Sequence, residues 1–237
     1  AVLRDCAKVR HEIPYLPTWC VMKIVGGVLW RVGCTGGDAK TVALILPGFC
    51  EGTNETAFLA LAFHDAGYRV DSLDRMGWNT MSLRRMVRRG IQRMRALRDA
   101  KARVVIVAHS KGAVCAKALA AFFPETVSGI VLLGAPLRGS RLADVFGRIP
   151  FLSRGLDLTD LMTTSPFLLA LARRKPRCPV YVVNAIGDGL ASTDRCRLTG
   201  VRRVRMRNTR GHLALLFSPE ARKKLRAIAH HLRRPGR

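Results

Sequence analysis

The sequence predicts a single α/β domain in which a mostly parallel sheet is covered by helices on both faces. From residue 41 onward, short runs rich in β-branched residues alternate with segments of helical periodicity, which is typical of strands joined by crossover helices. The chain has 237 residues, 49% of them hydrophobic and 24% charged, so it can bury a sizeable core. No internal repeat, low-complexity block or linker divides it. We therefore expect one domain over residues 1–237, with a cap or lid segment at 138–177.

The predicted elements follow one another in the order that such a domain requires. We interpret the apolar run at 21–32 as an opening hairpin. After it we expect strands at 41–46, 104–109, 130–133, 179–186 and 201–206, and helices at 82–98, 113–121 and from 218 onward. In the helix at 82–98, apolar residues recur at helical spacing and seven arginines occupy other positions.

A serine between small residues ends the strand predicted at 104–109. Residues 104–112 are Val-Val-Ile-Val-Ala-His-Ser-Lys-Gly, and a small-residue helical stretch follows. Strand, sharp turn and helix form the context of a nucleophile elbow. The strained turn requires small residues two positions before and two after the serine, here Ala108 and Gly112. Glycine is usual at the first position, and a methyl group is the smallest departure from it. We expect Ser110 to be a nucleophile.

A serine hydroxyl needs a histidine base, which a carboxylate orients. Three of the six histidines follow Ser110, and His230 and His231 belong to the basic C-terminal helix. His212 lies on a glycine-containing loop between the last predicted strand and that helix, where a base would reach the sheet edge. We expect His212 to be the base; a surface or core histidine is the alternative.

The acid should end the strand that precedes the histidine loop. Asp188 follows the strand at 179–186 in the turn Gly-Asp-Gly, and we favour it as the orienting carboxylate. Asp194, six residues further on, is the alternative acid. Each could instead be an ordinary aspartate of a loop.

Two backbone N–H groups should form an oxyanion hole for the tetrahedral intermediate. One should belong to Lys111, directly after the serine, and the other should come from the loop after the third strand of such a sheet. We take the strand at 41–46 as that third strand. Pro-Gly-Phe-Cys-Glu-Gly follows it, and we expect Phe49 to present its N–H after the turn at Gly48.

In these motifs the chain resembles α/β-hydrolases, in particular small bacterial lipases and esterases whose elbow is Ala-His-Ser-x-Gly. The resemblance rests on residues 108–112, 130–140, 187–189 and 211–218, in motif order over roughly residues 40–233. It implies the hydrolase fold and ester hydrolysis. Two positions depart from the pattern: Pro47 stands where His precedes the oxyanion glycine, and Lys111 stands where these lipases often carry an apolar residue.

The segment between the strands at 130–133 and 179–186 is rich in apolar residues and is expected to contain short helices and loops. Lipase-like folds carry their cap at this place in the chain. We expect the segment to form much of the acyl-binding wall, with substrate contacts from Phe151, Leu152, Phe167 and Leu168; an ordinary crossover helix is the alternative. This composition favours medium or longer acyl chains.

The chain is strongly basic, with 41 Lys and Arg against 16 Asp and Glu, a net charge of +25. Basic helices are usually solvated faces of a packed domain. A field of this size nevertheless attracts polyanions, and we expect peripheral contact with anionic membrane surfaces. Non-specific nucleic-acid binding at low salt is compatible with this charge, but no nucleic-acid motif is present, so we expect no specific recognition.

The seven cysteines contain no C-x-x-C pair, so neither a zinc site nor a redox motif is indicated. We expect Cys50 and Cys115 to pack near the site. The sequence leaves undecided whether Cys178 and Cys196 form a disulfide bond. We find no apolar stretch of about eighteen residues that would span a membrane. No secretory signal is evident either, and the compartment stays open between cytoplasm and export after processing.

Together these residues predict a cofactor- and metal-free serine hydrolase that cleaves lipid-like carboxylic esters through an acyl-enzyme. An acyltransferase or a thioester or amide hydrolase would use the same triad. A non-catalytic protein that binds membranes or polyanions is the alternative of a different class. The sequence leaves the oligomeric state open.

Overall fold

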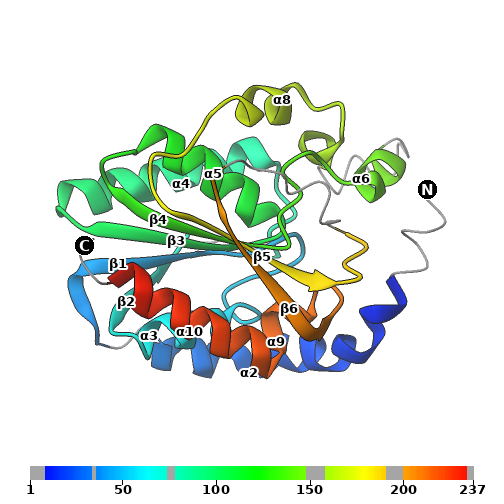
Figure 1. Ribbon diagram of the computed structural model, residues 1–237, viewed down its shortest axis with the longest axis horizontal. Coiled ribbons are helices and arrows are strands. Elements are labelled where there is room, and N and C mark those ends of the chain that lie inside the picture. The colour runs from blue at the N-terminus through cyan, green and yellow to red at the C-terminus, as the bar shows by residue number, and fades with distance from the viewer. Residues whose placement is uncertain (1–8, 34–35, 74–77, 148–157, 191–199, 234–237) are drawn as a thin grey trace.

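Six parallel strands form the centre of the molecule, and helices cover both faces of the sheet (Figure 1). The computed structural model describes residues 9–33, 36–73, 78–147, 158–190 and 200–233. The strand order is β2-β1-β3-β4-β5-β6, and every neighbouring pair is parallel. The strands are β1 (Asp38–Leu46), β2 (Tyr68–Ser72), β3 (Arg103–His109), β4 (Val127–Leu133), β5 (Val180–Ile186) and β6 (Arg202–Arg210). The prediction of an α/β fold with a mostly parallel sheet is confirmed.

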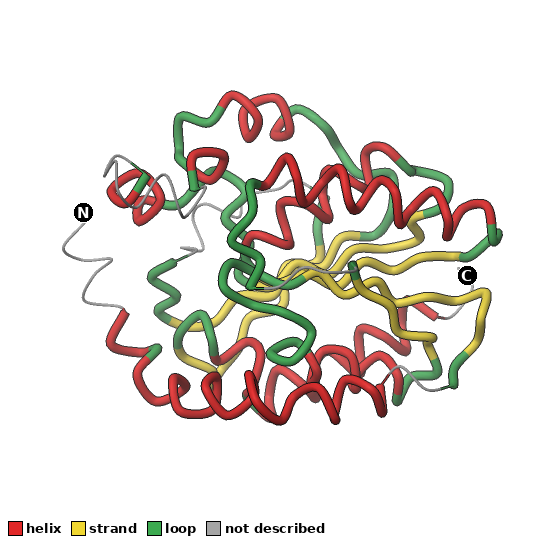
Figure 2. The backbone as a smooth tube through the Cα atoms, turned by 180° about the vertical axis from the view of Figure 1, so that it is seen from behind, coloured by secondary structure: helices red, strands yellow, loops and turns green. Residues whose placement is uncertain are grey.

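The helices form one layer on each side of the sheet (Figures 1 and 2). One layer contains α4 (Leu83–Asp99), α5 (Lys111–Phe122), α6 (Arg141–Phe146) and α8 (Pro166–Ala172). The other contains α2 (Leu16–Gly33), α3 (Ala57–His64), α9 (Ala214–Phe217) and α10 (Pro219–Arg233). Three short 3-10 turns complete the described elements: η1 (Val9–His11), η2 (Ile13–Tyr15) and η3 (Thr159–Leu161).

Each face of the sheet builds its own hydrophobic core. In β3, Val104, Ile106 and Ala108 belong to the cluster under α4 and α5, while Val105 and Val107 belong to the cluster under α3 and α10. This alternation follows from the two-residue period of a strand, and both sets are buried because helices cover both faces. The rigid sheet holds the loops at the carboxyl ends of its strands at one edge.

The opening hairpin predicted at 21–32 is wrong, because these residues lie within the helix α2. The β-branched residues that suggested a strand face outward, whereas Met22 and Gly26 are buried. A Cβ on Gly26 would lie 2.3 Å from the Asn54 carbonyl oxygen, so at this glycine the helix approaches the loop that precedes α3. With no hairpin in front of it, the strand that we counted as the third is β1, the first strand in the chain and the second in the sheet order.

The expectation that no stretch could span a membrane is also wrong by length and composition. The helical residues Ile13–Arg31 have a mean hydropathy of 1.2, and only 11% of that window is buried. A single such helix near the N-terminus is weak evidence for a span, since signal sequences pass the same test.

Candidate active site

Ser110 lies in a strained turn between β3 and α5. Its backbone adopts φ 51° and ψ −120°, a conformation that non-glycine residues rarely take. The Ser110 N–H donates to the carbonyl oxygen of Leu133, the last residue of β4, at 2.9 Å. The turn is therefore fixed against the neighbouring strand, and the serine stands at the carboxyl edge of the sheet.

The two small residues around Ser110 are required to different degrees. A Cβ on Gly112 would lie 2.4 Å from the Leu46 carbonyl oxygen and 2.6 Å from that of Pro47, so only glycine lets α5 approach β1. Ala108, in contrast, is fully buried in the core cluster, and its methyl group fits there. The departure from the Gly-x-Ser-x-Gly pattern thus falls at the tolerant position.

Asp188 and His212 form a buried pair at the same edge. Asp188 follows β5 and His212 follows β6, and the Asp188 Oδ2 lies 2.8 Å from the His212 Nδ1. Glycines with positive φ precede both residues, Gly187 at 64° and Gly211 at 91°, and turn the chain at each strand end. The predicted alternative acid, Asp194, lies outside the described residues.

The His212 ring lies against the end of β4, next to the serine turn. A Cβ on Gly134 would lie 2.7 Å from the His212 Cε1, so the ring packs directly on this glycine. The preceding residue, Leu133, accepts the Ser110 N–H. The His212 Nε2 is buried and has no hydrogen-bond partner in the described part of the chain. Catalytic hydrogen bonds are often incomplete without substrate and tighten when it binds.

Three carboxylates surround His212 and set its charge. Burial works to lower the pKa of His212, but the Asp188 carboxylate and its hydrogen bond oppose this, and Glu51 and Glu12 add to their effect. The result is a pKa above the ordinary histidine value. The site therefore favours the imidazolium that forms when a base takes up a proton.

The loop after β1 is held through its own backbone. The Asn79 Nδ2 donates to the carbonyl oxygens of Pro47 at 3.0 Å and Gly48 at 2.6 Å. From the other side, the Lys23 Nζ donates to the Cys50 carbonyl oxygen at 2.7 Å. Because the carbonyls are fixed, the N–H groups between them are fixed as well.

The two predicted oxyanion donors flank the serine turn. Phe49 lies in the loop after β1, and its N–H donates to no acceptor among the described residues. Lys111 is the first residue of α5. Its buried ammonium group lies 5.6 Å from the centre of the Phe49 ring and donates to the carbonyl oxygens of Asn79, at 2.8 Å, and Met81. The lysine that departs from the lipase pattern thus holds the segment before α4.

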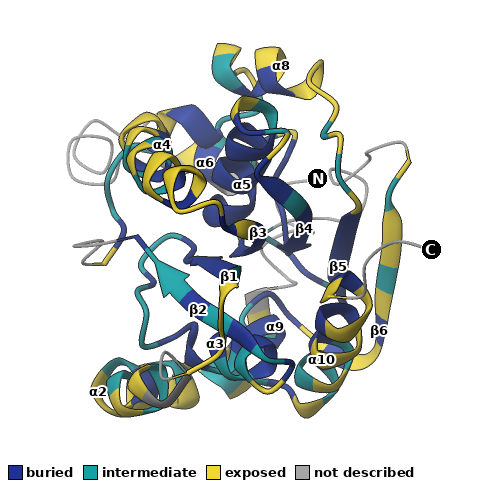
Figure 3. Cartoon of the chain, turned by 90° about the vertical axis from the view of Figure 1, so that its left-hand side faces the viewer, coloured by how far each residue is buried: buried dark blue, intermediate teal, exposed yellow. Residues whose placement is uncertain are grey.

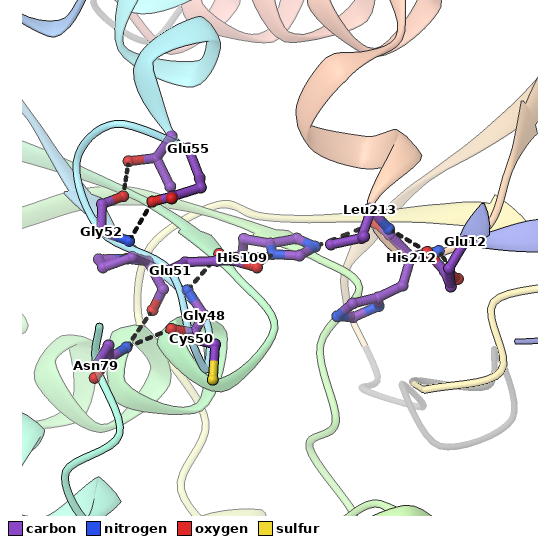
Figure 4. A network of polar contacts seen from close by, with 12 residues as sticks. Glu12, Gly48, Cys50, Glu51, Gly52, Glu55, Asn79, His109, His212 and Leu213 are labelled. Carbon is purple, nitrogen blue, oxygen red and sulfur yellow. Dashed lines mark hydrogen bonds and ion pairs between the residues drawn. The ribbon is translucent and has the colours of Figure 1, made fainter. Parts of the chain in front are cut away.

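A second buried acid–histidine pair adjoins the first, and sequence analysis did not find it (Figure 4). The His109 Nδ1 lies 2.8 Å from the Glu51 Oε1, and the His109 and His212 rings are 4.5 Å apart. The Glu51 Oε2 also accepts the Gly48 N–H at 2.6 Å. This glutamate therefore links the loop after β1 to the residue before Ser110. A histidine directly before the serine was the only signal in the sequence.

Glu12 was missed too, and no local signal marked it. Its carboxylate is buried and accepts the N–H groups of His212 at 2.5 Å and Leu213 at 2.7 Å. It fixes the backbone on which the base stands.

The predicted cap segment contributes α6, η3 and α8. Leu168 is buried in the core cluster and Phe167 packs against it, so α8 is anchored as an ordinary crossover helix would be. The predicted contacts Phe151 and Leu152 lie outside the described residues. Among the cysteines, Cys115 is buried, Cys50 is half-buried and Cys178 is a free thiol; Cys196 lies outside the described residues.

Comparison with solved structures identifies the fold. A metagenome-derived lipolytic enzyme from a study of LipS and LipT superposes with a TM-score of 0.65 at 16% identity, covering 84% of this chain and 95% of that one. A Bacillus licheniformis lipase, BlEst2 in its mature form, gives 0.61 at 15% identity, covering 84% and 94%. The chain has the α/β-hydrolase fold. A thioesterase domain from the curacin biosynthetic pathway gives 0.59 at 17% identity, covering 81% and 92%.

In sequence, no protein-family model and no curated protein matches the chain. Its place in the hydrolase fold therefore rests on structure. Ser110 follows β3, Asp188 follows β5 and His212 follows β6, so the three residues lie in this order along the chain and at the carboxyl edge of the sheet. Among the described residues, no group of three His, Cys, Asp or Glu side chains could hold a metal ion.

Proposed function

We propose that this chain is a serine carboxylic-ester hydrolase that acts on lipid-like esters through an acyl-enzyme. One observation carries the proposal: the buried Asp188–His212 pair, joined at 2.8 Å, stands beside the strained Ser110 turn at the same edge of the sheet. Strain at a serine and a buried ion pair both cost stability, and such features gather at functional sites.

In the first step, Ser110 Oγ attacks the ester carbonyl carbon while His212 Nε2 takes up the hydroxyl proton. Asp188 holds the imidazole through Nδ1 and stabilises the imidazolium. The tetrahedral oxyanion accepts hydrogen bonds from the N–H groups of Phe49 and Lys111. The intermediate then collapses, the imidazolium returns the proton to the leaving alcohol, and the acyl group stays on Ser110.

In the second step, a water molecule takes the place of the alcohol. His212 removes a proton from the water as it attacks the acyl-enzyme carbonyl. The tetrahedral intermediate then collapses, the bond to Ser110 Oγ breaks, the imidazolium returns the proton to that oxygen, and the carboxylic acid is released. Loss of one oxyanion donor typically lowers kcat by about 10²–10³-fold. The network that holds the loop after β1 therefore bears directly on the rate.

For the acyl chain we propose the cap segment at 138–177 as one wall. Leu168 fills the core, so a contact from α8 would come from Phe167, which is only partly buried. The neighbours named as lipases and lipolytic enzymes are consistent with a lipid-like acyl group, although their identity to this chain supports the fold alone.

The proposal is tested with p-nitrophenyl esters from short to long acyl chains. We expect Ser110→Ala to lower kcat by roughly 10⁶-fold, and Asp188→Asn to lower it by roughly 10⁴-fold. Ser128→Ala is the matched control: Ser128 is the second residue of β4, at the opposite edge of the sheet, so its substitution should leave the rate unchanged. Equal rates for Ser110→Ala and the folded parent would refute the serine mechanism.

The fold also occurs in the thioesterase domain named above, so the same panel should include acyl thioesters. A folded parent that cleaves thioesters but no oxygen ester would replace the proposed substrate class and keep the triad. Product that forms only when an alcohol acceptor is added would indicate an acyltransferase. A folded parent inactive in every assay would favour a non-catalytic role for the scaffold.

A further inference from the structure

Exposed apolar side chains gather on one helix. Of the ten large hydrophobic residues that are exposed in the described structure, six lie in the segment 13–28, namely Ile13, Leu16, Val21, Ile24, Val25 and Val28. Ile24 is 83% exposed and Val28 is 67% exposed. Figure 3 shows α2 at the periphery with its outer side exposed. An apolar patch that water would otherwise cover usually marks a surface that meets a membrane or another molecule.

The inner side of α2 is fixed to the domain, so the outer side cannot turn inward. The Asn54 Nδ2 donates to the Lys23 carbonyl oxygen at 2.8 Å, and the Lys23 Nζ lies 2.6 Å from the Glu55 carboxylate. Glu55 is buried. Three residues after Lys23, Gly26 packs on the Asn54 carbonyl oxygen. The middle of α2 is therefore docked on the protein, which is the arrangement of a helix that lies on a membrane surface and not of one that crosses it.

The charges around α2 match an anionic surface. Lys23 is the only charged residue between Ile13 and Trp30, and it is engaged on the inner side. Arg10 and Arg31, at the two ends of the segment, are exposed. Basic side chains at the ends of an apolar helix can reach lipid phosphates while their neighbours enter the acyl layer.

The net charge favours an anionic bilayer over a second copy of the chain as the partner of α2. With +25 on each molecule, two copies that met through α2 would repel, whereas an anionic bilayer attracts the same charge. We propose that α2 is a membrane-docking helix: its outer face, Val21, Ile24, Val25 and Val28, enters the surface of an anionic lipid bilayer with Arg10 and Arg31 at the phosphates.

This docking would bring the site to the lipid. Glu12, which holds the His212 and Leu213 backbone, directly precedes η2, the short turn that leads into α2. Lys23, on α2 itself, holds the Cys50 carbonyl of the loop after β1. The helix that meets the bilayer thus begins at the histidine loop. This consequence rests on the proposed function, while the docking itself does not.

Vesicle sedimentation tests the docking. The whole chain is mixed with vesicles of phosphatidylcholine alone or of phosphatidylcholine with phosphatidylglycerol, at low and high salt. We expect binding to the anionic vesicles, weakened by salt, and a loss of at least about tenfold in partitioning for Ile24→Asp with Val28→Asp. The matched control is Phe122→Asp with Leu169→Asp, which places two acids at exposed apolar positions in the opposite helix layer and should bind as the parent does.

Thermal unfolding verifies that each variant is folded, and hydrolysis of a short soluble ester reports the site separately. Selective loss of vesicle binding by the α2 variant supports the docking whether or not any ester is cleaved. Equal binding by the parent and the α2 variant, or no binding by the parent to either vesicle, overturns it. A parent that is dimeric in sedimentation, with a monomeric α2 variant and no vesicle binding, would assign the face to a second copy and also overturn the proposal.

Discussion

The Glu12 carboxylate accepts the backbone N–H of His212 at 2.5 Å, although the two residues are 200 positions apart in the chain. The same carboxylate contributes to the raised pKa of His212. One side chain from the N-terminal segment thus both positions the histidine loop and favours the charged imidazole. A substitution of Glu12 therefore changes the position and the charge of the base together.

Glu12→Gln removes the charge and keeps one acceptor oxygen, so one of the two N–H groups of His212 and Leu213 loses its acceptor. Since a nearby negative charge raises the pKa of His212, its loss should lower that pKa. The acidic limb of the kcat/KM profile should then move to lower pH, because the neutral base persists further into acid. The measurement is the pH dependence of ester hydrolysis.

Glu220→Gln is the control for this shift. The Glu220 carboxylate also accepts backbone N–H groups, from Arg207 at 2.7 Å and Asn208 at 2.9 Å, but it lies on α10. We expect the acidic limb of the kcat/KM profile of the Glu220→Gln variant to coincide with that of the parent. If both variants shift the limb equally, the effect of Glu12 is not local to His212.

Glu51→Gln should lower kcat for ester hydrolysis. The Glu51 carboxylate accepts the Gly48 N–H and pairs with His109, so it positions the loop that carries Phe49. We expect kcat to fall by roughly 10²-fold with little change in KM, as for a lost oxyanion contact. Glu125→Gln, at an exposed position, should leave both constants unchanged. A rise in KM alone would mean that Glu51 serves substrate binding.

Glu51 should also make stability depend on pH. Burial works to raise its pKa, but His109 and the Gly48 N–H lower it below the ordinary glutamate value. A depressed pKa in the folded state stabilises the protein above the unfolded pKa, and this stability is lost as the pH falls through the folded value. The melting temperature of the parent should therefore decrease in acid more steeply than that of Glu51→Gln.

Two substitutions in the serine turn should have unequal effects. In Gly112→Ala the new methyl group would lie 2.4 Å from the Leu46 carbonyl oxygen, so α5 must move and both melting temperature and activity should fall. Ala108→Gly removes a buried methyl group and restores the usual motif, at a cost of about 1 kcal/mol in unfolding free energy. Thermal denaturation with ester hydrolysis measures both. If Ala108→Gly lowered the melting temperature and the activity more than Gly112→Ala does, Gly112 would not be the position at which α5 approaches β1 most closely.

Phe167→Ala should shift the preferred acyl length if α8 forms part of the acyl wall. The neighbouring Leu169, 60% exposed on the same helix, provides the matched control Leu169→Ala. We expect only Phe167→Ala to lower kcat/KM for long esters relative to short ones. Identical chain-length profiles for the two variants would exclude this residue from the wall.

Much of the sheet and of the candidate triad could be predicted from the sequence, because both depend on local patterns. Runs of β-branched residues mark strands that are buried on both faces, and the elbow, the acid turn and the histidine loop each carry their signal within a few residues. Since parallel strands end at one edge, the order of these motifs in the chain also predicts that they meet.

What only the tertiary structure decided are contacts between residues distant in the chain. Residues 21–32 have a composition that suits a strand, but they form a helix in which Met22 is buried and Gly26 packs on the Asn54 carbonyl oxygen, a contact that no local pattern contains. Glu12 and Glu51 are likewise ordinary glutamates in the sequence, and only the fold buries them beside backbone N–H groups and the two histidines. The sequence by itself determined the layers of the sheet and the residues at its edge, since side-chain period and turn chemistry are local. The tertiary structure decided which charges hold those residues in place, because burial and pairing depend on the whole chain.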